Sequence, residues 1–420
     1  MSAAATIQSN AFVSGVATLA GGQGIAMALP ILTAPILGRL FSPHDYGLLG
    51  AYMSIAVVAA TIGNWQYAQA IVFEKRDERA WALVRVCVWT SLVTAALALA
   101  VPLAFAAMTL EAGGMAELRP WLWLVPVSAF ISGMTGCYTA LANRFTRYGD
   151  MAAIQAGTAV ATAAVSIALG WYGWSAAGLL VSYLVGQVVT FAAYGALYRS
   201  LRAQAPDTSP LLSRAMGRRH RSYPMYSLPT SVLEQLAANA PVYALGLAGA
   251  PQLIGLMSRA RTLLGAPLAL IGNAMTQVFQ QRAARDYARA GDCRRIFKST
   301  FLTLGGLGIV PALVLAVAAP WLFETYLGPK WRDAGDIARI LAPMLMLQLV
   351  VSPLSAVMQI AGRQKLDLAL TIGYKLLVAA AVALPVALRL DPVAIIVGYS
   401  LAMSATYLLY LGVCWRLAKR

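Results

Sequence analysis

Four charged side chains lie deep inside long apolar segments of this sequence: Glu234, Arg259, Arg261 and Lys375. Two more, Arg85 and Arg339, lie near segment ends, where they can reach the lipid headgroups. A charge at the centre of a lipid bilayer costs about 2.5–3.5 kcal/mol, so such a residue is usually kept for pairing, ligand binding or transport. Three of the four charges are positive, and Arg makes planar, bidentate hydrogen bonds to phosphate oxygens. The set therefore favours an anionic, phosphate-bearing ligand.

Arg259 and Arg261 are two residues apart, which separates their side chains by about 200° around a helix. The two side chains therefore cannot both point into one cavity. Both arginines are candidates for binding the substrate. We favour Arg261 as the one that faces the cavity, with Arg259 reaching outward or pairing elsewhere in the protein, and the opposite assignment stays open.

Glu234 and Lys375 have similar expected depths, about 10 Å from the cytoplasmic ends of their segments at 1.5 Å per residue. One interpretation is a structural ion pair, the usual fate of charges inside a membrane. The other is a proton-coupled or Na⁺-coupled switch in which Glu234 is paired in one state and free in the other. Both interpretations stay open.

Neutral polar side chains take the place of charges in the first half of the chain, because its acidic residues all fall between the apolar segments. Gln23, Asn64 and Gln66 are the main candidates for hydrogen bonds to the hydroxyl groups of a ligand. The alternative is that they join neighbouring helices, as polar residues in membrane helices often do.

Apolar segments of membrane-spanning length position these residues. A bilayer core about 30 Å thick needs roughly 20 apolar residues of helix, and twelve such segments follow one another in this 420-residue chain. We place them at residues 11–38, 46–73, 81–108, 119–142, 151–170, 175–198, 227–248, 254–280, 299–323, 336–361, 368–388 and 393–415.

Most of the 32 Lys and Arg residues lie in every second gap between these segments, above all in residues 199–226 and 281–298. Basic loops stay on the cytoplasmic side, so the pattern predicts a multi-pass protein of the inner membrane with both termini in the cytoplasm. The same rule accounts for the net charge of +16, so we expect no nucleic-acid partner.

Several kinds of chemistry lack their required residues. The four cysteines have no paired spacing and there are two histidines, so we expect no disulfide framework, no metal site and no cofactor. The sequence contains no GxxxxGK[ST] phosphate loop and no HExxH motif, and the gaps on the non-cytoplasmic side are short. An enzyme is therefore not expected.

A weak internal repeat divides the chain. Residues 42–48 (SPHDYGL) match residues 250–256 (APQLIGL), and residues 62–64 (IGN) match residues 271–273 at nearly the same offset. Duplicated halves around a central cavity are common in transporters. We therefore expect an all-α protein with an N-lobe at 1–205, a cytoplasmic connector at 206–226 and a C-lobe at 227–420.

Several stretches resemble polysaccharide transport proteins of the Wzx type, which are oligosaccharide flippases of the multidrug/oligosaccharidyl-lipid/polysaccharide exporter superfamily. They are PILGRLFSPHDYG at 35–47, YAQAIV at 67–72, YPMYS at 223–227, RTLLGAPL at 261–268 and QVF at 277–279. The resemblance extends over essentially the whole chain. It is specific for the family but not for a particular sugar.

The resemblance implies two six-helix bundles that face a cavity open alternately to each side of the membrane. It also implies export of an undecaprenyl-pyrophosphate-linked oligosaccharide for O-antigen, capsule or exopolysaccharide assembly. Arg261 and Lys375 would then compensate the pyrophosphate charge, while the prenyl tail stays in the lipid. A polysaccharide polymerase and a chain-length regulator are the protein partners that such a role implies.

Two alternatives remain at this stage. An ion-coupled drug exporter of the same fold is expected to need buried carboxylates for its cationic substrate, and here buried bases outnumber buried acids. A noncatalytic scaffold of a glycan assembly complex would have no use for charges inside the membrane.

Overall fold

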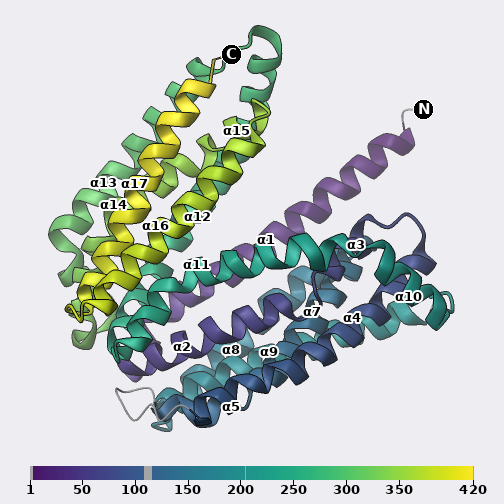
Figure 1. The fold of residues 1–420 in the computed structure, drawn as a ribbon, viewed down its shortest axis with the longest axis horizontal. Coiled ribbons are helices and arrows are strands. Elements are labelled where there is room, and N and C mark those ends of the chain that lie inside the picture. The colour runs from purple at the N-terminus through teal and green to yellow at the C-terminus, as the bar shows by residue number, and fades with distance from the viewer. Residues whose placement is uncertain (1–2, 108–115, 204, 420) are drawn as a thin grey trace. The chain divides into compact units, whose positions relative to one another are not determined.

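The computed structural model describes residues 3–107, 116–203 and 205–419, with side chains described except at 3–20, 23 and 106–107. Its first half contains α1 (Ala3–Leu40), α2 (Pro43–Ile62), α3 (Tyr67–Phe73), α4 (Asp77–Ala98), α5 (Ala100–Ala107), η1 (Ala116–Leu118), α6 (Arg119–Leu122), α7 (Val125–Arg144), α8 (Tyr148–Trp171), α9 (Ala176–Arg202), α10 (Pro210–Arg219) and the π-helical turn η2 (Tyr223–Ser227) (Figure 1). Its second half contains α11 (Leu228–Leu247), α12 (Pro251–Ala290), α13 (Arg294–Leu327), η3 (Pro329–Trp331), α14 (Arg332–Leu354), α15 (Val357–Ile360), α16 (Gln364–Ala387) and α17 (Val393–Leu417).

The expected all-α membrane fold is confirmed. Within the described residues, 10 helices are long and apolar enough to cross a membrane, and no β-strand forms. The described part of α1 adds a shorter apolar helix at Gly24–Leu40. The seventh expected segment is the helix α11, which is not among the 10.

The chain packs into two units. The first consists of Met1–Phe41 and Leu48–Asn239, and the second of Ser42–Gly47 and Ala240–Arg420. The division along the chain falls inside α11. The expected N-lobe, connector at 206–226 and C-lobe stay a prediction. The first turn of α2 belongs to the second unit, although the rest of that helix belongs to the first.

The expected segment 46–73 is not one helix, and this prediction was wrong. α2 ends at Ile62 and α3 begins at Tyr67, because Trp65 and Gln66 adopt positive φ angles of 50° and 63°. At the break, Gly63 packs directly on Gly133 of α7, so close that a Cβ on Gly63 would lie 2.8 Å from the Gly133 Cα. Backbone hydrogen bonds such as Trp65 N–H to Ile62 O at 2.8 Å satisfy the turn.

In the first unit, α1 packs along α8, α8 along α9, and α4 along α7. Trp81 of α4 lies in a buried cluster that joins α3, α4, α7 and α10. Met216 of α10 is buried in this cluster, so this short helix packs against the rest of the first unit.

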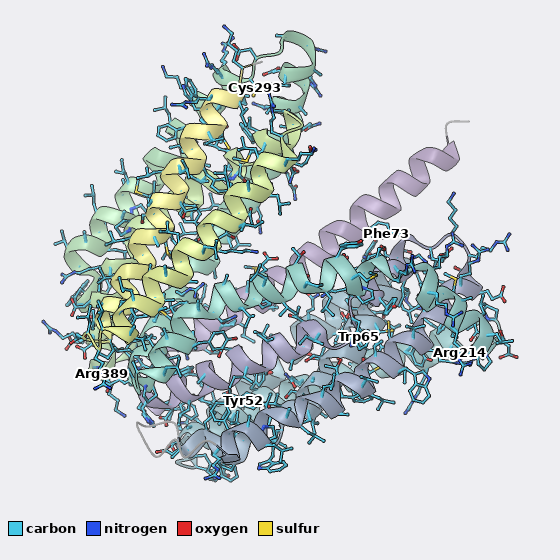
Figure 2. All side chains as sticks on the ribbon, viewed as in Figure 1. Tyr52, Trp65, Phe73, Arg214, Cys293 and Arg389 are labelled. Carbon is cyan, nitrogen blue, oxygen red and sulfur yellow. The ribbon has the colours of Figure 1, made fainter. Side chains whose placement is uncertain are left out.

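In the second unit, α14 is the central helix and packs against α12, α13 and α17. It approaches α13 closely, since a Cβ on Gly335 would lie 2.3 Å from the Pro320 Cα. The Cys293 N–H donates to Ala418 O at 2.8 Å and ties the start of α13 to the end of the chain; Figure 2 labels Cys293 at this end of the unit.

The two copies of the sequence repeat meet inside the second unit, and their contact is reciprocal. A Cβ on Gly47 would lie 1.8 Å from the Pro251 carbonyl oxygen, and a Cβ on Gly255 would lie 1.8 Å from the Pro43 carbonyl oxygen. Each glycine of one copy therefore rests on the proline of the other. This reciprocity supports the duplication that the sequence suggested.

We expect Gly255→Ala to destabilise the protein, because the added methyl group would overlap the backbone of α2 and overpacking of this kind costs about 1–3 kcal/mol or more. Gly265→Ala on the same helix is the matched control, since nothing lies within 4 Å of a Cβ at that position. Thermal unfolding in detergent should show a lower midpoint for Gly255→Ala alone. Equal midpoints for both variants would contradict the close crossing.

Candidate functional site

Arg259 is buried between two aromatic rings of the second unit. Its guanidinium carbon lies 3.7 Å from the ring centroid of Tyr46 and 6.0 Å from that of Trp331. The two rings contact each other edge to face at 5.5 Å. Cation–π attraction is strongest where water is excluded, so this arrangement binds α12, the first turn of α2 and the residue before α14 to one another.

The Arg259 guanidinium nevertheless keeps hydrogen-bonding capacity. Its Nε and Nη2 atoms are buried and have no hydrogen-bond partner among the described residues. The aromatic faces stabilise part of its positive charge, but they do not accept hydrogen bonds from these N–H groups. We interpret Arg259 as the structural member of the arginine pair, in line with the expectation from the sequence.

Arg261 points to a different neighbour. It is half-buried, and its guanidinium carbon lies 5.8 Å from the ring centroid of Tyr399 in α17. No carboxylate pairs with it among the described residues. The separation predicted from the helical spacing is therefore present, because Arg259 faces Tyr46 and Trp331 while Arg261 faces α17. That Arg261 binds substrate stays a proposal.

Lys375 is also buried, with a relative exposure of 8%, in α16 of the second unit. No ion pair of Lys375 is formed among the described residues. Glu234 is exposed on α11 in the part of that helix that belongs to the first unit. The Glu234–Lys375 pair thus stays a prediction. Exchanging the two residues would test it, because the exchange should restore folding that either single substitution impairs.

Asn64 and Gln66 lie at the break between α2 and α3. The Asn64 Nδ2 group donates to Gly133 O at 3.1 Å, and the Gln66 Nε2 group donates to Thr61 O at 3.2 Å. The Asn64 bond joins the break to α7, which is the structural alternative considered from the sequence, whereas the Gln66 bond stays within the turn after α2. Ligand binding by either residue stays a prediction. Gln23 lies in α1, and its side chain is outside the part that the structure describes.

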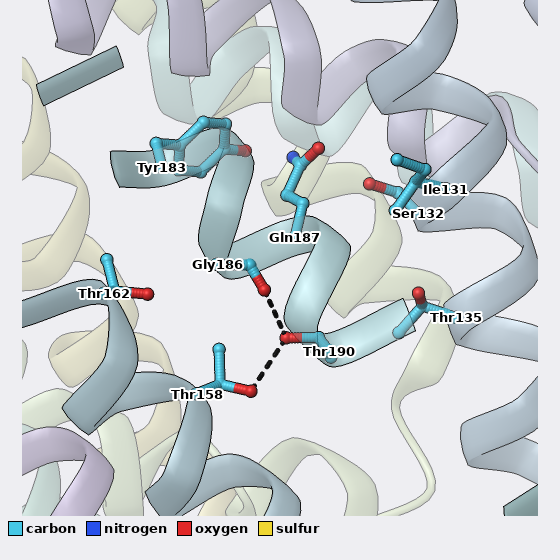
Figure 3. A pocket seen from close by; sticks show the side chains of 9 residues that line it. All are labelled: Ile131, Ser132, Thr135, Thr158, Thr162, Tyr183, Gly186, Gln187 and Thr190. Atoms are coloured by element: carbon cyan, nitrogen blue, oxygen red, sulfur yellow. Dashed lines mark hydrogen bonds between the residues drawn. The ribbon is translucent and has the colours of Figure 1, made fainter. Parts of the chain in front are cut away.

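A cavity lies between α7, α8 and α9 of the first unit (Figure 3). Its volume is about 350 Å³. Most of its lining residues carry a hydroxyl or amide group, but the surface that they expose inside the cavity is mainly apolar. The lining residues are Ile131, Ser132, Thr135, Thr158, Thr162, Tyr183, Gly186, Gln187 and Thr190. Sequence reasoning missed this cavity, because single Thr and Ser residues in apolar helices give no signal until the helices are oriented.

An ionic cluster holds α10 on the end of the first unit. The Glu74 carboxylate is buried and lies 3.1 Å from His220 Nε2 and 3.7 Å from Arg79. Burial alone would raise the pKa of Glu74, but hydrogen bonds from His220 and the Lys75 N–H, with the charge of Arg219, outweigh it and lower that pKa. The Tyr67 hydroxyl adds a hydrogen bond to Gly217 O at 3.1 Å.

The chain resembles known proteins in sequence and in fold. The sequence matches the model of a family described as polysaccharide biosynthesis protein over residues 36–336. None of the curated proteins matches the chain.

Solved structures share the fold at low sequence identity. The lipid II flippase MurJ in an inward closed conformation gives a TM-score of 0.71 at 12% identity over 94% of this chain and 86% of that chain. An inward-facing multidrug resistance MATE family transporter of the MOP superfamily gives 0.58 at 16% identity over 93% and 95%. A MOP superfamily transporter from Pyrococcus furiosus, described as having a binding pocket of reverse polarity, gives 0.52 at 17% identity over 97% and 96%.

We expect Glu74→Gln to loosen α10, because the neutral amide gives up the charge-assisted contact with His220. Amide hydrogen exchange at residues 210–219 should then become faster, while Glu78→Gln, which alters an exposed neighbour, should leave it unchanged. A lowered pKa also means that the contribution of Glu74 is full above its ordinary pKa near 4.5 and is lost as the pH falls through the lowered value. Unchanged exchange in Glu74→Gln would show that apolar packing alone holds α10.

Proposed function

Since the chain belongs to the polysaccharide biosynthesis protein family and shares its fold with the flippase MurJ and with MATE transporters, we propose that it flips a polyprenyl-pyrophosphate-linked oligosaccharide across the inner membrane. Undecaprenyl pyrophosphate is the carrier that the motif resemblance implies. Proteins of this kind bind and release their substrate without altering its covalent bonds. We therefore propose no enzymatic reaction.

The observation that carries the proposal is the pair of cations Arg261 and Lys375 in membrane-spanning helices of the second unit. Neither has a carboxylate partner among the described residues, although a charge inside the membrane normally has one. A pyrophosphate would supply the missing negative charge. Arg261 would offer it paired N–H donors, and Lys375 a compact ammonium group.

The same charges separate this proposal from export of a cationic drug. A fold-level likeness to MATE transporters does not select a substrate, because one fold hosts many functions. A cationic drug would need carboxylates deep in the membrane, whereas Arg259, Arg261 and Lys375, the charges deepest in the apolar segments of the second unit, are positive. The scaffold alternative leaves these buried cations without a role.

The proposed transport cycle alternates access between the two sides of the membrane. The glycan and the pyrophosphate enter from the cytoplasmic side while the prenyl tail stays in the lipid, so the apolar tail never leaves an apolar solvent. Release on the outer side would supply O-antigen, capsule or exopolysaccharide assembly. A polysaccharide polymerase and a chain-length regulator are the proposed partners there.

We expect Arg261→Ala to abolish flipping of the lipid-linked oligosaccharide while the protein still folds. Arg261→Lys should recover only part of the activity, because an ammonium group cannot make the planar, bidentate contact. Arg285→Ala, which removes an exposed arginine from the same helix, is the matched control. Flipping can be measured in proteoliposomes with an undecaprenyl-pyrophosphate-linked oligosaccharide, and full activity of Arg261→Ala would contradict the assignment.

We also propose that both termini and the basic segments 199–226 and 281–298 are cytoplasmic. Arg214→Cys should therefore resist an impermeant thiol reagent added to intact spheroplasts, whereas Arg389→Cys should react quickly; Figure 2 labels both exposed arginines. The four native cysteines are buried, and burial with the charge of Asp292 raises the pKa of Cys293 to about 11, so they give little background. The opposite labelling pattern would invert the topology.

A further inference from the structure

An apolar groove lies between α12, α13 and α14 of the second unit. Its volume is about 210 Å³, and the residues that line it are all apolar. α14 forms the floor with buried side chains such as Ala342, Leu345 and Leu349. α12 and α13 form the walls, because each packs closely on α14 and little on the other. Such a lining offers dispersion contacts in place of hydrogen bonds, so it suits a hydrocarbon and not a sugar or an ion.

Two prolines on opposite walls account for the groove. Pro267 of α12 and Pro311 of α13 both line it. A proline inside a helix has no N–H to donate, and its ring displaces the carbonyl group four residues earlier, so the helix bends there. Each wall therefore bends where the groove lies.

The groove does not have the surface that usually joins one membrane helix to another. Such contacts depend on small residues that let two backbones approach. Gly308 is a small residue of the lining, but a Cβ at this position would lie 3.3 Å from Met346 Cγ, so the space beside Gly308 is already filled by α14.

Lipid can reach the groove along the side of α13. Leu307 lines the groove and is 49% exposed, and its neighbours Val310 and Leu313 are each 63% exposed. α13 is long and apolar enough to cross a membrane, where large exposed apolar side chains are favourable because the solvent is hydrocarbon. A hydrocarbon chain can therefore enter the groove from the bilayer without contacting water.

The groove begins one helical turn from Arg261. Leu264 and Leu268 of the lining follow Arg261 by three and seven residues, so they lie on the same face of α12. Measured from Pro251 at the start of α12, Arg261 lies about 15 Å along the helix, near the middle of the bilayer core. Bilayer phospholipids keep their phosphate at the membrane surface. A hydrocarbon chain whose phosphate group lies at this depth therefore belongs to a lipid in transit.

We propose that the groove binds the first isoprene units of the polyprenyl tail while Arg261 holds the pyrophosphate. The tail would follow Leu264, Leu268 and Ile271, the last of which lies about 15 Å beyond Arg261 along α12. The remaining isoprene units would extend into the bilayer. The proposal rests on the proposed function and adds to it a site for the lipid part of the substrate.

The test maps which part of the unaltered protein contacts the tail. The probe is undecaprenyl pyrophosphate with a photoreactive diazirine on an isoprene unit close to the pyrophosphate, in nanodiscs of phosphatidylethanolamine and phosphatidylglycerol. After illumination, mass spectrometry should find adducts in residues 264–271 and 307–315. A tenfold excess of unlabelled undecaprenyl pyrophosphate should reduce these adducts about tenfold by mass action. Phosphatidylglycerol with a diazirine on its acyl chain should label the groove less than the prenyl probe does.

A matched pair of variants tests the groove itself. Ala312→Phe fills it from α13 and should weaken labelling about tenfold, which corresponds to lost burial of about two methylene groups of the tail. Ala316→Phe, at an exposed position of the same helix, should label as the unaltered protein does. Unchanged labelling of Ala312→Phe would contradict the proposal.

Three outcomes of the mapping overturn the proposal, and the mapping decides even where Ala312→Phe does not fold. The adducts lie outside the groove, or phosphatidylglycerol labels the groove as strongly as the prenyl probe, or neither probe reaches it because a protein helix covers it. Flipping in proteoliposomes and its dependence on Arg261 are measured separately with unlabelled substrate, so they can remain intact when the groove fails this test.

Discussion

Two glycines allow the chain to cross itself, and much of the second unit depends on that crossing. Gly47 and Gly255 remove the side chains that would otherwise hold the starts of α2 and α12 apart. The Ser42 hydroxyl and the Asp45 carboxylate cap α2 at this point, with the Ser42 N–H donating to Asp45 Oδ2 at 2.7 Å. Tyr46 then lies beside Arg259, one turn beyond Gly255, and the cation is enclosed by rings.

The sequence alone predicts the features that depend on local pattern. Apolar segments of fixed length show where the helices lie, and matching segments at 42–48 and 250–256 show that the halves are related. The spacing of Arg259 and Arg261 shows that their side chains diverge, because the period of a helix fixes that angle. Each of these inferences needs information from one stretch of chain, or from the comparison of two stretches.

Features that depend on contacts between distant residues were beyond the sequence. The break after Ile62 requires Gly63 to meet Gly133, and an apolar segment carries no mark of that meeting. Glu74 and His220 are 146 residues apart. Nothing in the sequence indicates their contact, because it depends on how α10 packs on the first unit. The sequence also does not show that the threonines of the cavity lie together, because their grouping depends on how α7, α8 and α9 are rotated.

The reciprocal contact of the two repeats has the form of an isologous interface, in which the same residues of two related segments meet across a twofold axis. Pro43 rests on Gly255 as Pro251 rests on Gly47, so the two copies contribute alike to the backbone contact. The crossing is therefore a contact between two like segments of one polypeptide, as expected if both derive from duplication of one ancestral segment.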